Sequence, residues 1–168
     1  MIGHTSPEIF ASFPRGMGLT AYQSIGTGFE GVFSYRSLSP DQKQRVIQLI
    51  TYFQDYLKPS TGKRKTTTIE EIANTQFSHF PANQQALLLF LRAVVGRPGL
   101  LILDEPSQGM DENIWERCKV FLREEWASKE GKDQAVVVVS HYEDEVPWRK
   151  GEGMIFKLDQ GMGVALSP

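Results

Sequence analysis

The chain has 168 residues, of which 18 are basic and 20 acidic, so its formal net charge at pH 7 is −2. This length suits one domain with a core of its own. The near balance of charge gives none of the broad positive field that nucleic-acid binding requires. A single basic cluster, Lys63 to Lys65, has no aromatic residues interleaved with it, and we interpret it as a solvated loop. No nucleic-acid partner is expected.

Cysteine content and hydropathy restrict the compartment. The one cysteine, Cys118, excludes an internal disulfide and a cysteine-rich zinc site, and we expect it to pack as a small hydrophobe. No apolar run approaches the roughly 18 residues that cross a bilayer. The N-terminal stretch also lacks a basic segment followed by an apolar one. We therefore expect a soluble intracellular protein, in the cytoplasm or in an organellar matrix.

The first half of the chain predicts helices after an irregular start. Residues 1–38 show no sustained period and predict irregular structure with short strands or a short helix near 21–24. A helix is predicted over 39–57, because Ser39 can cap it, Pro40 suits its first position and Gln42 can complete a capping box. Its apolar residues recur at spacings of three and four: Val46, Ile50, Phe53 and Leu57.

The segment 62–67, GKRKTT, contains a Gly-Lys pair like that of a phosphate loop. However, Leu57 stands where the first glycine of such a loop belongs, no apolar strand leads in, and no apolar helix follows Lys63. We predict that this segment does not bind phosphate. The sequence has no other candidate for a phosphate loop.

The second half of the chain alternates strands and helices. After a short helix at 69–73 and a largely buried helix from Asn83, strands are predicted over Leu100–Leu103 and Ala135–Val139, with an amphipathic helix from Glu112 to Ser128 between them. Both strands lack alternation, so we expect them to be buried on both faces of a parallel sheet covered by helices. The tail predicts a hairpin with its turn between Asp159 and Gly163. The fold class is α/β.

Polar residues follow both buried strands directly. Asp104 and Glu105 come after the first strand, and Ser140 and His141 come after the second. Because ligands gather at the carboxyl edge of an open parallel sheet, these side chains are expected to meet. In nucleotide hydrolysis one carboxylate orients Mg²⁺, a second positions or deprotonates the attacking water, and a histidine can hold the terminal phosphate. The alternatives are turn capping by the two acids and a surface role for His141.

These motifs resemble those of ABC-type ATPases. LLILDEPSQGMD, at 100–111, resembles the Walker B segment and D-loop of that family, and VVVVSH, at 136–141, resembles its switch-histidine strand. FPANQ, at 80–84, stands where the signature sequence belongs, followed by Arg-Ala at 92–93 and Arg-Pro at 97–98. The detailed form is most similar to the second cassette of ModF-like tandem ATPases, described as molybdate-transport or photorepair proteins.

The resemblance implies a partial P-loop NTPase fold with a helical subdomain. One partial cassette would span 1–168, with the helical and signature subdomain at about 39–83 and the Walker B, D-loop and switch-histidine core at 84–168. The implied cofactors are ATP and Mg²⁺. The implied partners are ATP itself, a second cassette in tandem or as a dimer, and a separate membrane permease.

The same resemblance assigns roles to five residues. Asp104 would hold Mg²⁺ through water, Glu105 would serve the hydrolytic water, and His141 would contact the γ-phosphate. Gln84 would belong to the signature that reaches a nucleotide held by the opposite cassette. Asp111 would communicate across the dimer.

Three departures from the family pattern bear on activity. The Walker A phosphate loop is absent from the sequence, and IGHTSPE at 2–8 resembles the segment that normally follows it, so the chain is expected to begin partway through a cassette. Pro7 stands in place of that segment's glutamine. In the signature, Pro81 replaces a serine that would bind phosphate, and Asn83 replaces a glycine that permits close approach.

Two functional hypotheses follow. The chain is part of an ABC-type ATPase that can energise transport, with a missing segment or partner supplying the phosphate loop, so that the isolated chain is inactive. Alternatively, it is a non-catalytic regulatory or interaction remnant of a cassette. A third hypothesis, a metal enzyme using His141 with Glu143, Asp144 and Glu145, is less attractive because those acids suit the solvated start of a helix. A sheet without its first strands would expose an edge or apolar face, so we expect poor solubility or a need for a partner.

Overall fold

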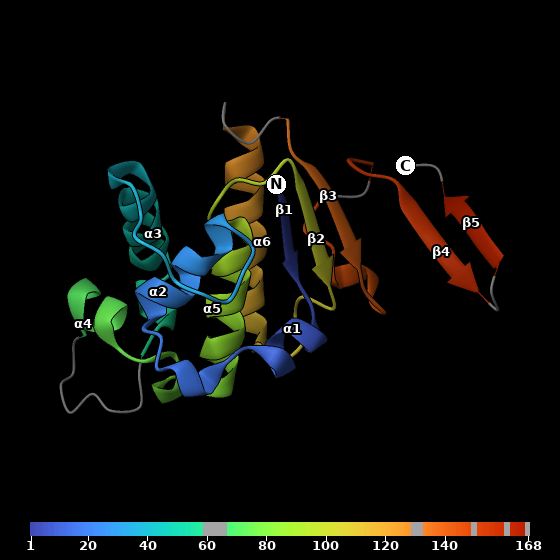
Figure 1. Ribbon diagram of the computed structural model, residues 1–168. Coiled ribbons are helices and arrows are strands. Elements are labelled where there is room, and N and C mark those ends of the chain that lie inside the picture. Colours follow the sequence, from blue (N-terminus) through green and yellow to red (C-terminus); the bar gives the residue numbers. More distant parts are fainter. Residues whose placement is uncertain (59–66, 129–132, 149–150, 160–161, 167–168) are drawn as a thin grey trace.

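The computed structural model describes residues 1–58, 67–128, 133–148, 151–159 and 162–166. Most of the GKRKTT segment and the whole Lys63 to Lys65 cluster lie outside these residues. In chain order the helices and strands are β1 (Ile2–Thr5), α1 (Pro7–Ser12), α2 (Ala21–Gly26), α3 (Pro40–Tyr52), α4 (Ile69–Asn74), α5 (Ala82–Val94), β2 (Leu100–Asp104), α6 (Glu112–Ala127), β3 (Ala135–Val139), β4 (Ile155–Asp159) and β5 (Met162–Leu166) (Figure 1).

A parallel sheet in the order β1-β2-β3 forms the centre of the molecule (Figure 1). His4, Ile102 and Val137 lie side by side across its three strands, and the register continues to Asp104 beside Val139. The predicted order of strand, helix and strand over 100–139 is confirmed, with α6 as the connection. The strand β1 arises within the stretch for which the sequence predicted mainly irregular structure.

Only one face of this sheet is buried, so the prediction of burial on both faces is wrong. Val136 and Val138 pack against the core, whereas Val137 is 47% exposed and Val139 is 51% exposed. The reason is that α5 and α6 lie on the same side of the sheet (Figure 1). Within the described residues, the opposite face has no covering layer. An all-apolar strand therefore does not require two covering layers in this chain.

The helical layer forms as its sequence signals indicate. The Ser39 side chain accepts a hydrogen bond from the Gln42 amide, and the Gln42 side chain accepts one from the Ser39 amide, so the predicted capping box is present. All four apolar positions predicted for this helix are buried, although α3 ends at Tyr52 and continues as a short 3₁₀ turn. Cys118, on α6, is fully buried as predicted, and burial raises the pKa of its thiol.

A buried arginine connects the N-terminal segment to α5. Arg92 is 5% exposed, donates hydrogen bonds to Thr27 Oγ1 at 2.9 Å and to the Val32 carbonyl at 3.3 Å, and lies over the Phe33 ring. Burial lowers the pKa of its guanidinium. The 3₁₀ turn at Thr27–Phe29 therefore packs directly on α5, while α2 packs against α3, α4 and α5.

The C-terminal strands form a separate sheet. β4 and β5 pair antiparallel, with Phe156 opposite Ala165 and Asp159 opposite Met162, so the predicted hairpin is confirmed. It stands beyond β3 in Figure 1. Phe156 and Leu158 are exposed on it. Across the described residues, no helix combines the length and apolar character needed to span a membrane.

Candidate functional site

Two carboxylates lie where β2 ends. Asp104 is the last residue of the strand and stands beside Val139, the last residue of β3. Glu105 follows with φ 43°, a left-handed conformation that side chains other than glycine seldom adopt. Its amide donates to the Val139 carbonyl at 2.8 Å, which extends the strand pairing by one residue. The strained turn thus begins at Glu105, directly after the last pair of the sheet.

The structure brings Glu105 and His141 together, as the strand-edge argument predicts. His141 Nε2 lies 3.0 Å from Glu105 Oε1, and the imidazole is 80% exposed while the carboxylate is 33% exposed. An exposed pair of this kind contributes little to stability. Its importance lies in the position: a titratable base and a carboxylate meet at the carboxyl edge of a parallel sheet, where ligands are expected.

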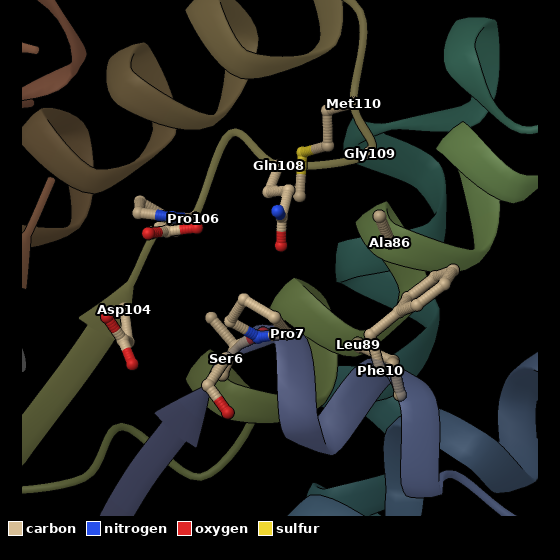
Figure 2. A pocket seen from close by; sticks show the side chains of 12 residues that line it. Ser6, Pro7, Phe10, Ala86, Leu89, Asp104, Pro106, Gln108, Gly109 and Met110 are labelled. Carbon is tan, nitrogen blue, oxygen red and sulfur yellow. The ribbon is translucent and has the colours of Figure 1, made fainter. Parts of the chain in front are cut away.

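A small cavity opens beside these carboxylates. It has a volume of about 180 Å³ (Figure 2). Asp104 reaches it from the end of β2, Ser6 from the turn after β1, and Pro7 from the first turn of α1. Glu105 and Gln108 reach it from the turn that follows β2. Apolar side chains close the remaining wall: Phe10, Ala86, Leu89 and Met110.

The lining decides what this cavity can hold. Carboxylate and hydroxyl oxygens are the donors that Mg²⁺ prefers, so the Asp104 and Glu105 side fits that ion. At about 180 Å³ the cavity is smaller than most sites for drug-sized ligands, which usually measure about 300 Å³ or more. No lysine or arginine lines the cavity in the described part of the chain, and the two carboxylates would repel bare phosphates. The donor set therefore suits the metal of a nucleotide site and not its phosphates.

The other two predicted site residues lie in a separate group. Asn83 Nδ2 donates to Asp111 Oδ2 at 2.9 Å, while Asp111 Oδ1 accepts the Ile114 amide and caps α6. Gln84 Oε1 accepts the Lys58 amide at 2.7 Å. Among the described residues, no hydrogen bond joins Gln84 or Asp111 to Asp104, Glu105 or His141. Both side chains are engaged within the chain.

The turn between β1 and α1 forms the wall opposite Asp104 in Figure 2. Ser6 caps α1 by accepting the Ile9 amide, and Pro7 is the first residue of that helix. Pro7 offers the cavity only ring carbons, as expected from the sequence. The local helix start therefore explains why proline is tolerated at this position.

The acidic segment after His141 does not assemble a metal site. Glu143–Glu145 form a 3₁₀ turn, and Glu143 and Asp144 are exposed. No three histidine, cysteine, aspartate or glutamate side chains within the described ranges are placed to hold a metal ion. Glu145 is instead half-buried, with Ser107 and Ser140 donating to its carboxylate. This contact was not predicted from the sequence, because the three acids were interpreted as one solvated group.

Comparison with proteins of known structure identifies the class of fold. A dimeric bacterial ABC transporter cassette superposes with a TM-score of 0.59 at 20% identity, covering 86% of this chain and 53% of that one. A post-hydrolysis cassette bound to ADP and phosphate gives a TM-score of 0.53 at 20% identity, covering 76% of this chain and 48% of that one. The fold is that of an ABC cassette of the P-loop NTPase class, which confirms the predicted fold class.

Sequence relatives agree with this class. An uncharacterised ABC transporter ATP-binding protein of Schizosaccharomyces pombe is 30% identical over 146 residues, which is 87% of this chain and 26% of that protein. The ABC transporter ATP-binding protein ModF of Escherichia coli is 34% identical over 144 residues, which is 85% of this chain and 26% of ModF. No family model matches the chain.

The chain therefore belongs with the ABC transporter ATP-binding proteins, and the resemblance found in its motifs is confirmed. It spans about a quarter of the length of the curated relatives it matches.

Proposed function

We propose that the chain contributes the metal- and water-positioning half of an ATP hydrolysis site in an ABC-type ATPase. The observation that carries this proposal is the meeting of Glu105 and His141, 3.0 Å apart at the ends of neighbouring parallel strands, beside Asp104. The phosphate loop would come from another segment of a longer protein or from a separate polypeptide. The domain division at about residues 39–83 and 84–168 is part of the proposal.

Each side chain has a physical role in this proposal. Asp104 would hold Mg²⁺, and that ion would neutralise charge on the transferring phosphate. Glu105 orients the attacking water and accepts its proton, and His141 keeps the Glu105 carboxylate directed toward that water while its exposed edge contacts the terminal phosphate. The uncovered face of the sheet supports the view that a further segment must complete the site. Asp104 lies on that face together with Ile102 and the exposed Val137 and Val139.

The predicted roles of Gln84 and Asp111 and the predicted partners also belong to the proposal. Gln84 and Asp111 would meet a second cassette, since the solved relative with a similar fold is described as a dimer. Any coupling to transport would require a separate membrane permease. The name of ModF does not assign molybdate to this chain.

Hydrolysis by a completed cassette tests the proposal. The chain alone should show no Mg²⁺-dependent ATP hydrolysis, and addition or fusion of a phosphate-loop segment should restore it. Glu105→Gln should then lower kcat by about 100-fold or more, because the water loses its base. Glu112→Gln, at an exposed position on α6, is the matched control and should leave kcat unchanged. Hydrolysis that survives Glu105→Gln would contradict the assigned role.

A non-catalytic interaction module is the second candidate. It is favoured by the engagement of Asp111 with Asn83 and of Gln84 with Lys58, because these contacts occupy the side chains that would couple the chain to a nucleotide. In that case the completed cassette would bind a second cassette with no ATP hydrolysis. Size measurements with and without Mg²⁺-ATP, beside the hydrolysis assay, separate the two functions.

A further inference from the structure

Side chains of α6 donate hydrogen bonds to the backbone carbonyls of the segment that follows His141. Trp115 Nε1 donates to the Glu145 carbonyl at 3.1 Å, Lys119 Nζ to the Asp144 carbonyl at 2.8 Å, and Arg123 Nε to the Pro147 carbonyl at 2.6 Å. The three donors are spaced four residues apart, so they lie on one face of the helix. Together they fix the path of 144–147 against the partly buried helix α6.

The Glu145 side chain reaches from this fixed segment to the ends of both central strands. Its Oε1 accepts a hydrogen bond from Ser107 Oγ, and its Oε2 accepts one from Ser140 Oγ. Ser107 lies two residues after Glu105, and Ser140 is directly before His141. One carboxylate therefore joins the two chain segments that carry the candidate catalytic pair. A second cavity of about 210 Å³ borders this bridge on the side of His141.

The side-chain contact between His141 and Glu105 does not by itself fix where the imidazole lies. His141 is 80% exposed, and its Nε2 contact is with Glu105. A single contact between exposed side chains of this kind is too weak to impose one geometry. The backbone beside it is better fixed, because the Tyr142 amide also donates to Ser140 Oγ at 3.0 Å. The location of His141 thus depends on how Ser140 is anchored.

We propose that Glu145 is a positioning residue that keeps His141 in register with Glu105 by bridging Ser140 and Ser107. It touches no reacting group and acts through the two strand ends. The effect of Glu145 on hydrolysis rests on the proposed function. Its effect on the position of His141 can be tested even if the proposed function is wrong. The two effects can be measured separately.

The first experiment uses the isolated chain and the ring signals of its three histidines in NMR spectra. Glu145→Ala should shift the ring signals of His141 and leave those of His4 and His79 in place. Glu145→Gln should keep most of the wild-type position, because a carboxamide has the same shape and can bond both hydroxyls. Glu143→Ala, which removes an exposed acid two residues away, should change nothing.

If Glu145→Ala does not fold, variants that remove one of the two serine hydroxyls still test the proposal. Ser107→Ala and Ser140→Ala each remove one end of the bridge and leave its centre, so each should shift the His141 signals by less than Glu145→Ala. His141 signals that stay unmoved in both serine variants would overturn the proposal. So would an equal shift in Glu143→Ala.

The second experiment measures kcat and KM for ATP in the completed cassette. Glu145→Ala should lower kcat by about tenfold with KM changed less than about twofold, since a misplaced group costs rate more than binding. Glu145→Gln should recover most of the loss. Absence of any hydrolysis in the wild-type cassette would count against the proposed function alone. Normal, Glu105-dependent hydrolysis with an unaffected Glu145→Ala would count against the bridge alone.

Discussion

Glu125 shows how one half-buried carboxylate can join several parts of the chain. On α6, it accepts two hydrogen bonds from Arg45 of α3, at 3.1 and 2.7 Å, and one from Arg97 at 3.1 Å. Burial by itself would raise the pKa of Glu125, but the hydrogen bonds from Arg97 and Arg45 lower it below the usual value. The ionised form is therefore favoured in the folded state.

Replacement of this carboxylate should cost stability in a pH-dependent way. Glu125→Gln is expected to lower the free energy of unfolding by about 1–3 kcal/mol at neutral pH, because two arginines lose a charged acceptor. A lowered folded-state pKa contributes stability above the unfolded pKa and loses it as pH falls through the folded one. The difference from wild type should thus shrink toward acid pH. Urea titrations at several pH values, with Glu112→Gln as control, would show a constant difference if this account is wrong.

At the scale of elements, the contact between the 3₁₀ turn at Thr27–Phe29 and α5 leaves no room for a side chain. A Cβ added at Gly28 would lie 1.9 Å from the Arg92 carbonyl oxygen and 2.8 Å from Val95 Cγ1. The backbone of α5 cannot yield as a flexible side chain would. Since Arg92 also binds Thr27, the turn and the helix are held together by packing and by a hydrogen bond.

Gly28→Ala should therefore destabilise the protein by about 2 kcal/mol, as overpacking of a buried contact does. Gly16→Ala is the matched control, because an added Cβ there meets nothing within 4 Å. Thermal unfolding of both variants is the measurement. If the Gly28→Ala variant unfolds at the same temperature as the wild type, the tight contact between the turn and α5 does not contribute to stability as expected.

Local signals account for the elements that were predicted from the sequence. The Ser39 and Gln42 cap, the 3.6-residue period of α3 and the apolar runs of β2 and β3 each depend on neighbours in the chain. β1 was not recognised as part of the central sheet, because IGHT has no clear strand pattern and gains its order from pairing with β2. Within the candidate site, the meeting of Glu105 and His141 followed from the strand-edge rule. The bridge by Glu145 depends on a contact 38 residues along the chain, which has no local signature.

At the scale of the whole molecule, the outer face of the central sheet exposes apolar side chains. The exposed residues there come from two of its strands, namely Ile2, Val137 and Val139. In the described part of the chain, β3 pairs with β2 and has no partner on its other edge. An apolar face next to an unpaired strand edge favours association with other chains.

The isolated chain is therefore expected to self-associate and to bind a hydrophobic dye such as ANS. Val137→Thr combined with Val139→Thr should lower both, because it removes apolar area from the open face and keeps β-branched side chains that suit a strand. Sedimentation and dye fluorescence measure the two effects. A wild-type chain that stays monomeric and binds no dye would contradict this expectation.

The parallel direction of β1, β2 and β3 also limits what could extend this sheet at β3. An antiparallel neighbour can be supplied by a simple hairpin, but a parallel neighbour needs a crossover of about a dozen residues or more, usually a helix. Such a crossover is also the part that could cover Val137 and Val139. A separate peptide strand needs no crossover to pair in parallel with β3, but a strand that carries its helix would also cover Val137 and Val139, so it should complement better than the lone strand.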